Sequence, residues 1–561
     1  MNLAEFDPNQ IEDEGSRQAI MYLLNLVERQ QAELERLRQE NEGLREENNR
    51  LKGQSKKPKY KAEAVSDDER EGKEGEEYSS EKERKGAREG RGRKKRRKNK
   101  DIKIDREETL KVEQEQLPAD AEFKGHEEVI VQDIKVETDN VRFRKEKWYS
   151  PSEGKTYLAE MPMGYEGQFG PRLKAWVVVF AFALNVTEGK IENFLETTGI
   201  SISTGQIAAI IKQEMGRLEQ EKEAVYEAGL RSSDWQQIDD TGAKVNGENC
   251  YTQVVCNPYY TAYFTGKGKD RLTVLEVLWG GKELQFCLDE MAWVYLNECG
   301  LPQKYQAVLA TWPQAQLFSR TEFEERLQEE LPQLGPKQYK WVLEGAGIAA
   351  YHRQESWPVI ERLVCDDAGQ FKRIVSEQAL CWVHEGRHYQ KLSPVVGYHR
   401  QQLAAFRSEF WDYYRQLWAY RQQPTVAEKK RLSQEFDTLF ATQTGYEALD
   451  ERIAKTKAKK DELLRVLDHP ELPLHNNEAE LGARQRKPKE NISYGPRTTT
   501  GAKGWDTGLT LVATARKLGV NIFAYLHDRV GQLHQMPSLA DLITQKAAKD
   551  QAKSVAQPQA P

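Results

Sequence analysis

Acidic residues occur at three widely separated points where the sequence predicts the end of a strand or the start of a helix. The pair Asp239–Asp240 ends the first strand of a predicted three-strand meander, Asp366–Asp367 ends a later strand, and Glu478 and Glu480 open a helix. Carboxylates on two strands and one helix can converge on one face of a mixed sheet and bind two Mg²⁺ ions, because hard oxygen ligands suit Mg²⁺. Two ions about 3.5–4 Å apart stabilise both reacting oxygens of a phosphoryl transfer. Each pair alone is more often a solvated turn, but the three together favour a metal site.

The strands and helices that must position these carboxylates are predicted from the periodicity of hydrophobic residues along the chain. Three strands rich in β-branched and aromatic residues are WQQIDDTGAKV, ENCYTQVVCN and YYTAYFTG. Two more strands are predicted in ERLVCDDAGQF and EQALCWVH. The long segments between the acidic sites are amphipathic, which predicts helical insertions at residues 270–357 and 395–470. The spacing therefore indicates one sheet that carries two helical insertions.

Residues 126–225 are predicted to precede the sheet as a separate region. Alternating apolar residues at 127–148 suggest a small β element, and residues 170–225 are helical. A turn at Thr198-Gly199 is followed by Ser203 and Gln206, a plausible capping box. Helix, glycine turn and capped helix outline a helix-turn-helix for DNA binding, although short helical hairpins are also common without DNA.

The N-terminal segment predicts a dimerising coiled coil. Residues 16–53 form a heptad seam whose d positions are Leu23, Gln30, Leu37, Leu44 and Leu51. Val27, Leu34, Asn41 and Asn48 occupy the a positions. Leu at d with Asn at a is the pattern of parallel two-stranded coiled coils, in which a buried Asn fixes the register. The alternative is a single charged helix that packs on the chain's own core.

The segment between this helix and the rest of the chain is highly charged. Residues 63–81 carry nine acidic and two basic residues, and residues 82–100 carry twelve basic and two acidic residues. Low complexity predicts disorder over residues 54–125. The basic block, which includes Lys94, Lys95, Arg96 and Arg97, is either a solvated tail or an arm that binds DNA phosphates.

A second set of cations lies close to the acidic sites. Basic and aromatic residues directly follow Glu480, which suits contact with a DNA backbone. This set comprises Arg484, Arg486, Lys487, Lys489, Tyr494, Arg497, Lys503 and Trp505. Arg387 is expected to face DNA as well. A structural loop is the alternative for the set after Glu480. Cys381, His384 and His388 have zinc-like spacing, but a fourth ligand is not evident.

Composition narrows the classes of protein to which the chain can belong. The chain has 561 residues with 83 Lys+Arg against 89 Asp+Glu, so its net charge is −6. The longest apolar run, residues 175–184, is about half a membrane span, and the acidic N-terminus does not resemble a signal peptide. Six cysteines, none before Cys250, indicate no disulfide framework and fit a reducing cytosol. No P-loop, dinucleotide fingerprint or Ser-His-Asp order is present.

The motifs around the acidic sites resemble DDE transposases of bacterial insertion sequences, most closely the insertion-sequence-sixty-six family. The resemblance rests on IDDTGAKV, on LVCDDAGQF followed by CWVHEGRHYQKL, and on HNNEAELGARQRKPKENISYGPRTTTGAKGWDT, and spans roughly residues 170–530. It implies an RNase H-like core in which Asp239, Asp366 and Glu480 form the catalytic triad. Asp240, Asp367 and Glu478 are then neighbours rather than metal ligands.

Two departures from the family pattern stand out. Family members often carry a cysteine-rich, zinc-ribbon-like module between the coiled coil and the core, but residues 1–249 contain no cysteine. This departure puts the DNA-reading role of that module in doubt here. Members also often have Asp before the Asn-Asn pair, where this chain has His475. The second departure bears little on Glu480.

The sequence thus predicts a mixed α/β transposase that cleaves and joins DNA with two Mg²⁺ ions, or Mn²⁺, held by the triad. The expected partners are double-stranded DNA, a second copy and accessory proteins of the same element, in the bacterial cytoplasm at the nucleoid. The predicted regions are a coiled coil at 1–53, a linker at 54–125, a DNA-binding region at 126–225, a catalytic core at 226–510, and a C-terminal helix with polar tail at 511–561. The alternatives are an RNase H-like nuclease or resolvase without strand transfer, and a coiled-coil DNA-binding regulator without catalysis.

Overall fold

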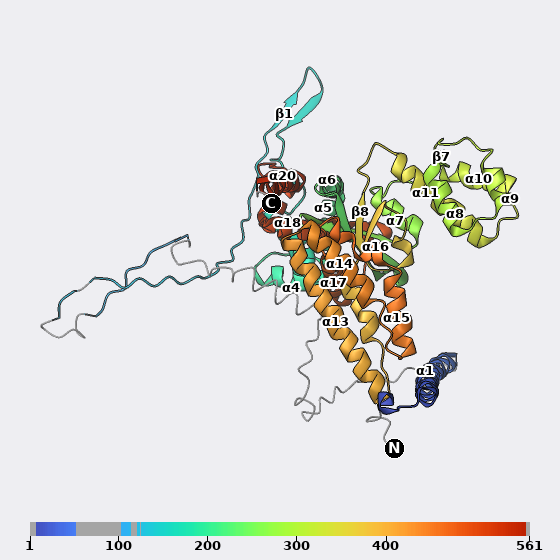
Figure 1. Ribbon diagram of the computed structural model, residues 1–561. Helices are drawn as coiled ribbons and strands as arrows, with labels where there is room; N and C mark the ends of the chain where they lie inside the picture. The colour runs from blue at the N-terminus through green and yellow to red at the C-terminus, as the bar shows by residue number, and fades with distance from the viewer. Residues whose placement is uncertain (1–6, 52–102, 114–120, 124, 557–561) are drawn as a thin grey trace. The chain divides into compact units, whose positions relative to one another are not determined.

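The computed structural model describes residues 7–51, 103–113, 121–123 and 125–556 (Figure 1). The basic block at 82–100, with Lys94, Lys95, Arg96 and Arg97, lies outside these residues. Two compact units divide the chain: the described residues of Met1–Ala64, Phe143–Phe194 and Ile202–Pro561 form the larger, and those of Val65–Arg142 and Leu195–Ser201 the smaller. None of the described helices is both long and apolar enough to cross a membrane.

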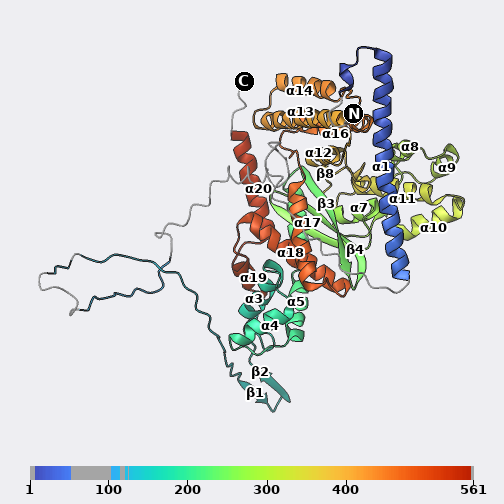
Figure 2. The ribbon, with the colours of Figure 1, turned by 90° about the horizontal axis from the view of Figure 1, so that it is seen from below.

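The sheet of the larger unit confirms the predicted meander and two later strands. Its strands are β3 (Trp235–Val245), β4 (Glu248–Asn257), β5 (Tyr260–Gly266), β8 (Arg362–Cys365) and β9 (Glu377–Leu380). They lie in the order β5-β4-β3-β8-β9, with β5, β4 and β3 antiparallel and β8 and β9 parallel to β3 (Figure 2).

The position of the aspartates on one strand and the boundary of another strand differ from the prediction. Asp239 and Asp240 lie in the middle of β3, because β3 continues as a long hairpin with β4 after its pairing with β8 has ended. The segment EQALCWVH is a strand only to Leu380, and a helix begins at Trp382. Cys381 at this junction is buried, as are Cys250 and Cys256 on β4.

Helices precede and follow the sheet in the chain. Those before it are α3 (Pro171–Val178), η5 (Val179–Ala183), α4 (Glu188–Thr197), α5 (Thr204–Arg217) and α6 (Glu219–Arg231). The predicted capping box at Ser203 and Gln206 is confirmed at the start of α5. Those near the C-terminus are α17 (Asn477–Ser493), α18 (Thr499–Leu518), α19 (Ile522–Val530) and α20 (Leu539–Ala556). Residues from Lys546 to Ala556 were predicted as a polar tail, but they continue α20, which buries Ile543 and Ala547.

Both predicted insertions are largely helical. The first holds α7 (Arg271–Leu278), α8 (Glu290–Cys299), α9 (Gln303–Leu309), α10 (Arg320–Glu330) and α11 (Pro336–Arg353), with a small sheet of β6 (Gln285–Phe286) and β7 (Phe318–Ser319). Between β8 and β9 lies η6 (Gly369–Phe371), and α12 (Trp382–Gln390) follows β9. The second insertion holds α13 (Gly397–Gln422), α14 (Val426–Leu439), α15 (Glu447–Lys457), α16 (Lys460–Leu463) and η7 (Arg465–Leu467). Trp382 packs against Phe410, Tyr413 and Phe436, which anchors this insertion to α12.

The predicted β element at 127–148 is displaced. Residues 125–146 contain no strand, and a hairpin of β1 (Lys147–Ser150) and β2 (Lys155–Leu158) follows instead. Apolar residues such as Val129 and Val131 alternate but remain exposed. Alternation predicts a strand only where a partner strand completes the hydrogen bonds, and in 125–146 the structure provides none.

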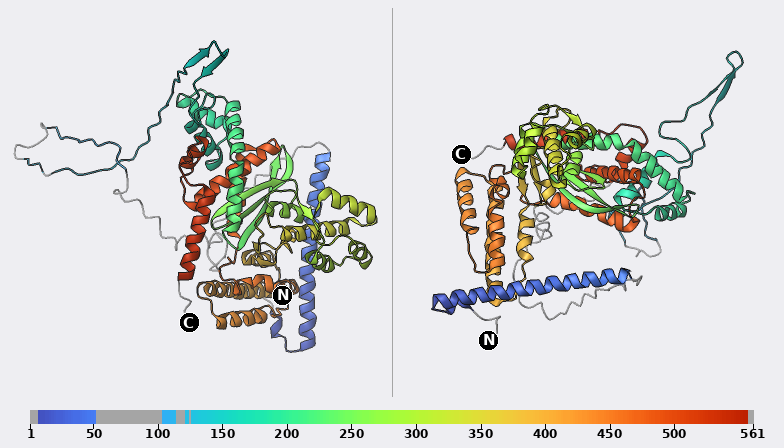
Figure 3. Two further views of the ribbon diagram at one scale, coloured as in Figure 1. Left: turned by 90° about the horizontal axis from the view of Figure 1, so that it is seen from above. Right: turned by 90° about the vertical axis from the view of Figure 1, so that its right-hand side faces the viewer.

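The N-terminal helix α1 (Glu14–Leu51), preceded by η1 (Pro8–Gln10), confirms the predicted helix. Most of its apolar seam is exposed, with Leu23, Leu37 and Leu44 at 55%, 47% and 61% of their full areas. Its early turns contact the second helical insertion, where Leu24 packs with Val396 and Tyr398 (Figure 3). The helix therefore combines an exposed apolar stripe with a docked face.

Candidate catalytic carboxylate site

Asp239 lies on β3, and Asp366 directly follows β8, the parallel strand next to β3. β3 pairs with β8 from Trp235 opposite Arg362 to Gln237 opposite Val364. The same offset of 127 residues relates Asp239 to Asp366, which lie two residues beyond the last pair, and the charge of Asp366 acts on Asp239. Asp366 directly follows β8, as predicted.

The start of α17 is fixed to this part of β3 by main-chain and amide hydrogen bonds. The side chain of Gln237 donates to the carbonyl of His475 at 2.8 Å, and the Asn476 amide donates to the carbonyl of Ile238 at 2.7 Å. The main-chain N–H of Asn476 donates to the sulfur of Cys381 at 3.2 Å. These bonds join β3, the start of α12 and the start of α17 around Asp239.

Gly482 allows α17 to lie directly on β4. A Cβ atom at this position would come within 2.7 Å of a methyl group of Val254, and the Tyr263 hydroxyl donates to the Gly482 carbonyl at 3.0 Å. A larger residue would push the helix away from the sheet. The close approach brings Glu480, two residues earlier and 8% exposed, towards the two aspartates.

The three acidic side chains interact electrostatically. Burial, together with the negative charges of Asp366 and Glu480, raises the pKa of Asp239 to about 7. A hydrogen bond from the main-chain N–H of Asp240 counteracts part of this shift. Within the described part of the chain, Asp239 and Asp366 form no salt bridge. Residues that are 127 and 114 positions apart along the chain thus share one site.

Glu480 differs from the aspartates because two arginines lie beside its carboxylate. Arg387 of α12 approaches both oxygens, at 3.4 and 3.3 Å, and His384 lies 3.5 Å away. Arg484, one turn further along α17, lies 3.9 Å away. Arg387 also donates to the Nε2 atom of His384 at 2.9 Å. This nitrogen therefore acts as an acceptor, which places the imidazole proton on Nδ1.

The neighbouring acidic residues are each satisfied by the protein itself. Asp240 accepts a hydrogen bond from Gln370 at 2.7 Å, and Glu478 pairs with Lys517 at 2.8 Å. Burial opposes ionisation of Asp367, but Lys372 and Lys459 outweigh it and hold the pKa of Asp367 below its ordinary value. Each of these three carboxylates thus has a partner within the protein.

The donor set of the site fits a hard divalent cation. Three carboxylates with uncompensated repulsion at Asp239 provide the oxygen ligands and the negative charge that Mg²⁺ prefers. Among the described residues, no three His, Cys, Asp or Glu side chains stand in a ready-made metal arrangement.

The lack of a ready-made metal arrangement among the described residues also bears on the zinc site that the spacing of Cys381, His384 and His388 suggested. Cys381 accepts a hydrogen bond from Asn476, and His384 contacts Glu480 and Arg387. The spacing of Cys381, His384 and His388 therefore does not assemble a zinc site in this part of the chain.

The basic residues after Glu480 divide between the surface and the interior. Arg484, Tyr494, Arg497 and Lys503 are exposed, Lys487 is half-buried, and Arg387 is partly exposed beside Glu480. Arg486 and Lys489 are 0% and 3% exposed and lie against Trp505. They share the buried face of α17 with Ala479, Gly482 and Ala483. As the structure stands, these two cations do not reach a DNA backbone.

A glycine turn positions Tyr494, one of the exposed residues that follow Glu480. Gly495 has a φ of +80°, and a Cβ atom there would come within 2.6 Å of the Lys244 carbonyl. The Asn246 N–H donates to the Pro496 carbonyl at 2.8 Å. The turn thus holds Tyr494, which is 90% exposed, beside the β3–β4 turn.

Sequence reasoning did not single out Asn476, Gln237 or His384 as members of the site. Asn476 belongs to the Asn-Asn motif that located Glu480, so its position next to the N-terminus of a helix was a usable signal. The contact between Gln237 and the His475 carbonyl spans 238 positions and leaves no local pattern.

Comparison with known proteins identifies the class. The Transposase IS66 family matches residues 166–282 and 349–504, and the gap between the matches lies within the first helical insertion. An uncharacterized protein, y4jO, of Sinorhizobium fredii (strain NBRC 101917 / NGR234) is 33% identical over 321 residues, which are 57% of this chain and 99% of that protein. These matches place the chain among transposases. Within that class it belongs to the IS66 family.

Proposed function

We propose that the protein is a DDE transposase that cleaves DNA at the ends of an insertion element and joins those ends to target DNA. Asp239, Asp366 and Glu480 would hold two divalent metal ions, Mg²⁺ or Mn²⁺. Water is the nucleophile in the first step and leaves a free 3′-hydroxyl at the element end. That hydroxyl then attacks a target phosphodiester, so one phosphate bond breaks as another forms and no covalent enzyme intermediate is needed.

One observation carries this proposal: burial, and after it the negative charges of Asp366 and Glu480, raise the pKa of Asp239 to about 7. Three carboxylates that repel one another inside a protein are costly unless a cation compensates them. The strand order β5-β4-β3-β8-β9, with a meander followed by two parallel strands, supports the RNase H-like core that the family resemblance implies.

The chain's own residues supply positioning and charge for this reaction. Gln237 and Asn476 hold the start of α17 against β3, so that Glu480 stays close to Asp239. Exposed Arg484, Arg497 and Lys503 would bind DNA phosphates beside the carboxylates. Metal ions, when bound, would lower the pKa of the attacking water and neutralise the charge that develops on the phosphate.

Joining of DNA distinguishes this proposal from its alternatives. The test incubates the purified protein with Mg²⁺, a labelled duplex that carries the inverted repeats flanking its own gene, and a supercoiled target plasmid. The proposal expects products in which the label is covalently attached to the plasmid. Cleaved label without joined product would indicate a nuclease or resolvase, and bound but uncut DNA would indicate a regulator.

We also propose that the active protein is a homodimer held by α1. Replacing Leu37 and Leu44 together with Ala is expected to weaken association, by about 2–5 kcal/mol per leucine if the seam packs like a core.

Replacing Asn41 and Asn48 with Leu is expected to strengthen association but to permit trimers or tetramers, because buried Asn pairs fix the number of strands. Light scattering of the full-length chain at tens of micromolar measures both effects. A monomeric wild type would contradict the dimer.

The basic block at 82–100 is expected to add affinity for DNA without sequence preference. Lys and Arg on phosphates release counterions, and each phosphate contact contributes about −0.9 to the slope of log K against log salt for duplex DNA. Deleting residues 82–100 should therefore flatten the salt dependence and preserve the preference for element ends. Fluorescence anisotropy titrations at several salt concentrations measure the slope. An unchanged slope would reduce the block to a solubility tail.

A further inference from the structure

The contacts of α1 divide between two sides of the helix. Numbering the heptads from the seam places Leu23, Val27, Leu34, Leu37 and Leu44 at a and d, and all five are exposed by 36% or more. The residues that dock on the second helical insertion are Met21 and Glu28 at b, Arg29 at c, Leu24 at e and Asn25 at f. Only Ile20, at a, belongs to both sets, since it packs at the edge of the Leu24 cluster. The exposed seam is therefore clear of the docked face from Leu23 onward.

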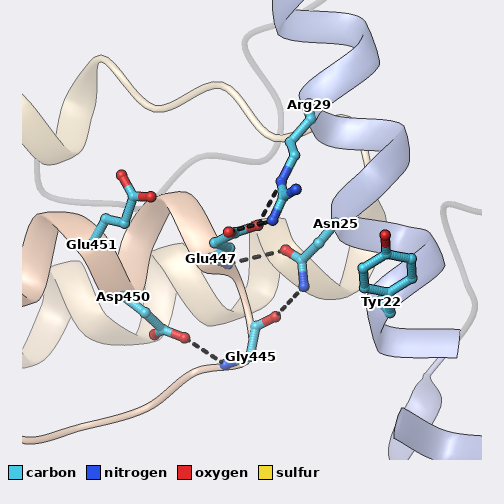
Figure 4. Close-up of a pocket in the computed structure, with 7 residues that line it drawn as sticks. All are labelled: Tyr22, Asn25, Arg29, Gly445, Glu447, Asp450 and Glu451. Atoms are coloured by element: carbon cyan, nitrogen blue, oxygen red, sulfur yellow. Dashed lines mark hydrogen bonds and ion pairs between the residues drawn. The ribbon is translucent and has the colours of Figure 1, made fainter. Parts of the chain in front are cut away.

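The docked face, which we call the clamp, is made of specific polar bonds around a small apolar contact. Leu24 is 4% exposed and packs with Val396 and Tyr398. Asn25 donates to the Gly445 carbonyl at 2.9 Å and accepts from the Glu447 N–H at 3.0 Å (Figure 4).

Charged residues reinforce the clamp. Arg29 pairs with Glu447 across a cavity of about 410 Å³ that Tyr22 and Asp450 also line (Figure 4). The Glu28 carboxylate accepts from the N–H groups of Val395 and Val396, at 3.0 and 2.8 Å. These groups precede the first turn of α13, where an anion is favoured by the helix dipole.

Charges beside the seam are complementary to a second copy of the same helix. Glu33 and Glu40 occupy g positions, and Arg38 and Arg45 occupy the e positions five residues further on. In a parallel, in-register pair, each g residue faces the following e residue of the partner, so both Glu33–Arg38 and Glu40–Arg45 contacts are attractive. All four side chains are exposed. An antiparallel pair would set Glu against Glu and Arg against Arg.

We infer that α1 is a two-sided coupling helix. Its seam and its e and g charges pair in parallel with α1 of a second copy, while the clamp keeps it fastened to the helical insertion of its own chain. Because the clamp ties α1 to the body that carries the carboxylates, dimerisation joins two catalytic bodies through a fixed contact rather than a loose tether. This inference rests on the proposed dimer and names its orientation and its attachment.

The orientation is tested by exchanging charges in the full-length chain. One variant carries Glu33→Lys and Glu40→Lys, and the other carries Arg38→Glu and Arg45→Glu. Each variant alone should dimerise at least about tenfold more weakly than wild type, because four attractive contacts become repulsive. An equimolar mixture should restore the dimer, since every contact then joins opposite charges. The matched control, Glu35→Lys with Glu42→Lys at b positions, should leave the dissociation constant unchanged.

Each result decides between arrangements. Unchanged association of both single-charge variants would overturn the parallel pairing, because an antiparallel pair keeps its charge repulsion unchanged in either of them. Failure of the mixture to dimerise would place the interface elsewhere. The assay uses mass in solution and no DNA, so its failure is distinct from failure of the strand-transfer proposal.

The clamp is tested by hydrogen exchange of the same protein. Asn25→Ala with Glu28→Ala removes the acceptors of the Val395, Val396 and Glu447 amides, so peptides covering these residues should exchange faster while the dimer mass is retained. The Leu37→Ala and Leu44→Ala variant should show the converse, with reduced mass and unchanged exchange at these amides. Unchanged exchange in the clamp variant, or its dissociation to monomers, would overturn the two-sided arrangement.

Discussion

Replacing Asp239, Asp366 or Glu480 with alanine is expected to abolish joining of element ends while leaving DNA binding intact. Loss of one hydrogen-bond donor from a catalytic site costs about 10²–10³-fold in rate, and loss of a metal ligand should cost at least about 10³-fold. Binding should persist because exposed cations, such as Arg484 and Arg497, are unchanged. The joined product and the DNA dissociation constant are measured on the same preparations.

The matched control is Glu478→Ala, on the same turn of α17 as Glu480. Glu478 pairs with Lys517 at 2.8 Å, a partly exposed ion pair whose loss costs at most about 1 kcal/mol. This variant should keep most of the joining activity. If it is inactive while Glu480→Ala still joins DNA, the assignment along α17 is wrong by two residues. Thermal melting of each variant separates a lost ligand from a lost fold.

The parts of the fold that the sequence predicted depend on local pattern. The meander is recognisable because β-branched and aromatic residues alternate between short turns. The capping box of Ser203 and Gln206 is a contact over three residues. The placement of Asp366 after a buried strand likewise needed only the run ERLVC that precedes it. Each of these features is determined by side chains within a few residues of one another.

The parts that the sequence did not predict depend on distant contacts. Asn25 of α1 binds Gly445, which is 420 positions away, and neither residue lies in a pattern that indicates the contact. β6 and β7 pair over only two residues each, too short for any periodicity. Arg486 and Lys489 are an intermediate case: their helical spacing from Ala479 and Gly482 predicts a buried face, but their charge predicts a surface.

The pKa of Asp239 makes the metal-free protein sensitive to pH. The pKa of this carboxyl group is about 7 in the folded chain and has its ordinary value of 3.8 when the chain is unfolded, so between these pH values the folded state holds the extra proton. Stability therefore falls as pH rises from about 4 to 7, and the full penalty remains above pH 7. A shift of this size corresponds to about 4 kcal/mol.

Asp239→Asn is therefore expected to stabilise the protein in the absence of metal. In chelator at pH 8, urea unfolding should show the variant to be more stable than wild type by up to about 4 kcal/mol, and at pH 4 the two should be nearly equal. Asp367→Asn is the control of opposite sign. Lys372 and Lys459 hold the pKa of Asp367 below its ordinary value, so its loss should destabilise the chain at pH 8 and matter less as pH falls.

Divalent metal should reverse the advantage of Asp239→Asn. Mg²⁺ compensates the charges of Asp239, Asp366 and Glu480, so it should raise the melting temperature of wild type at pH 8 and leave that of Asp239→Asn nearly unchanged. Because binding requires the ionised carboxylate, the apparent metal affinity of wild type should fall about tenfold per pH unit below 7. Calorimetric titration with Mn²⁺ from pH 6 to 8 measures this slope. A metal affinity that is independent of pH in this range would mean that Asp239 is not a ligand.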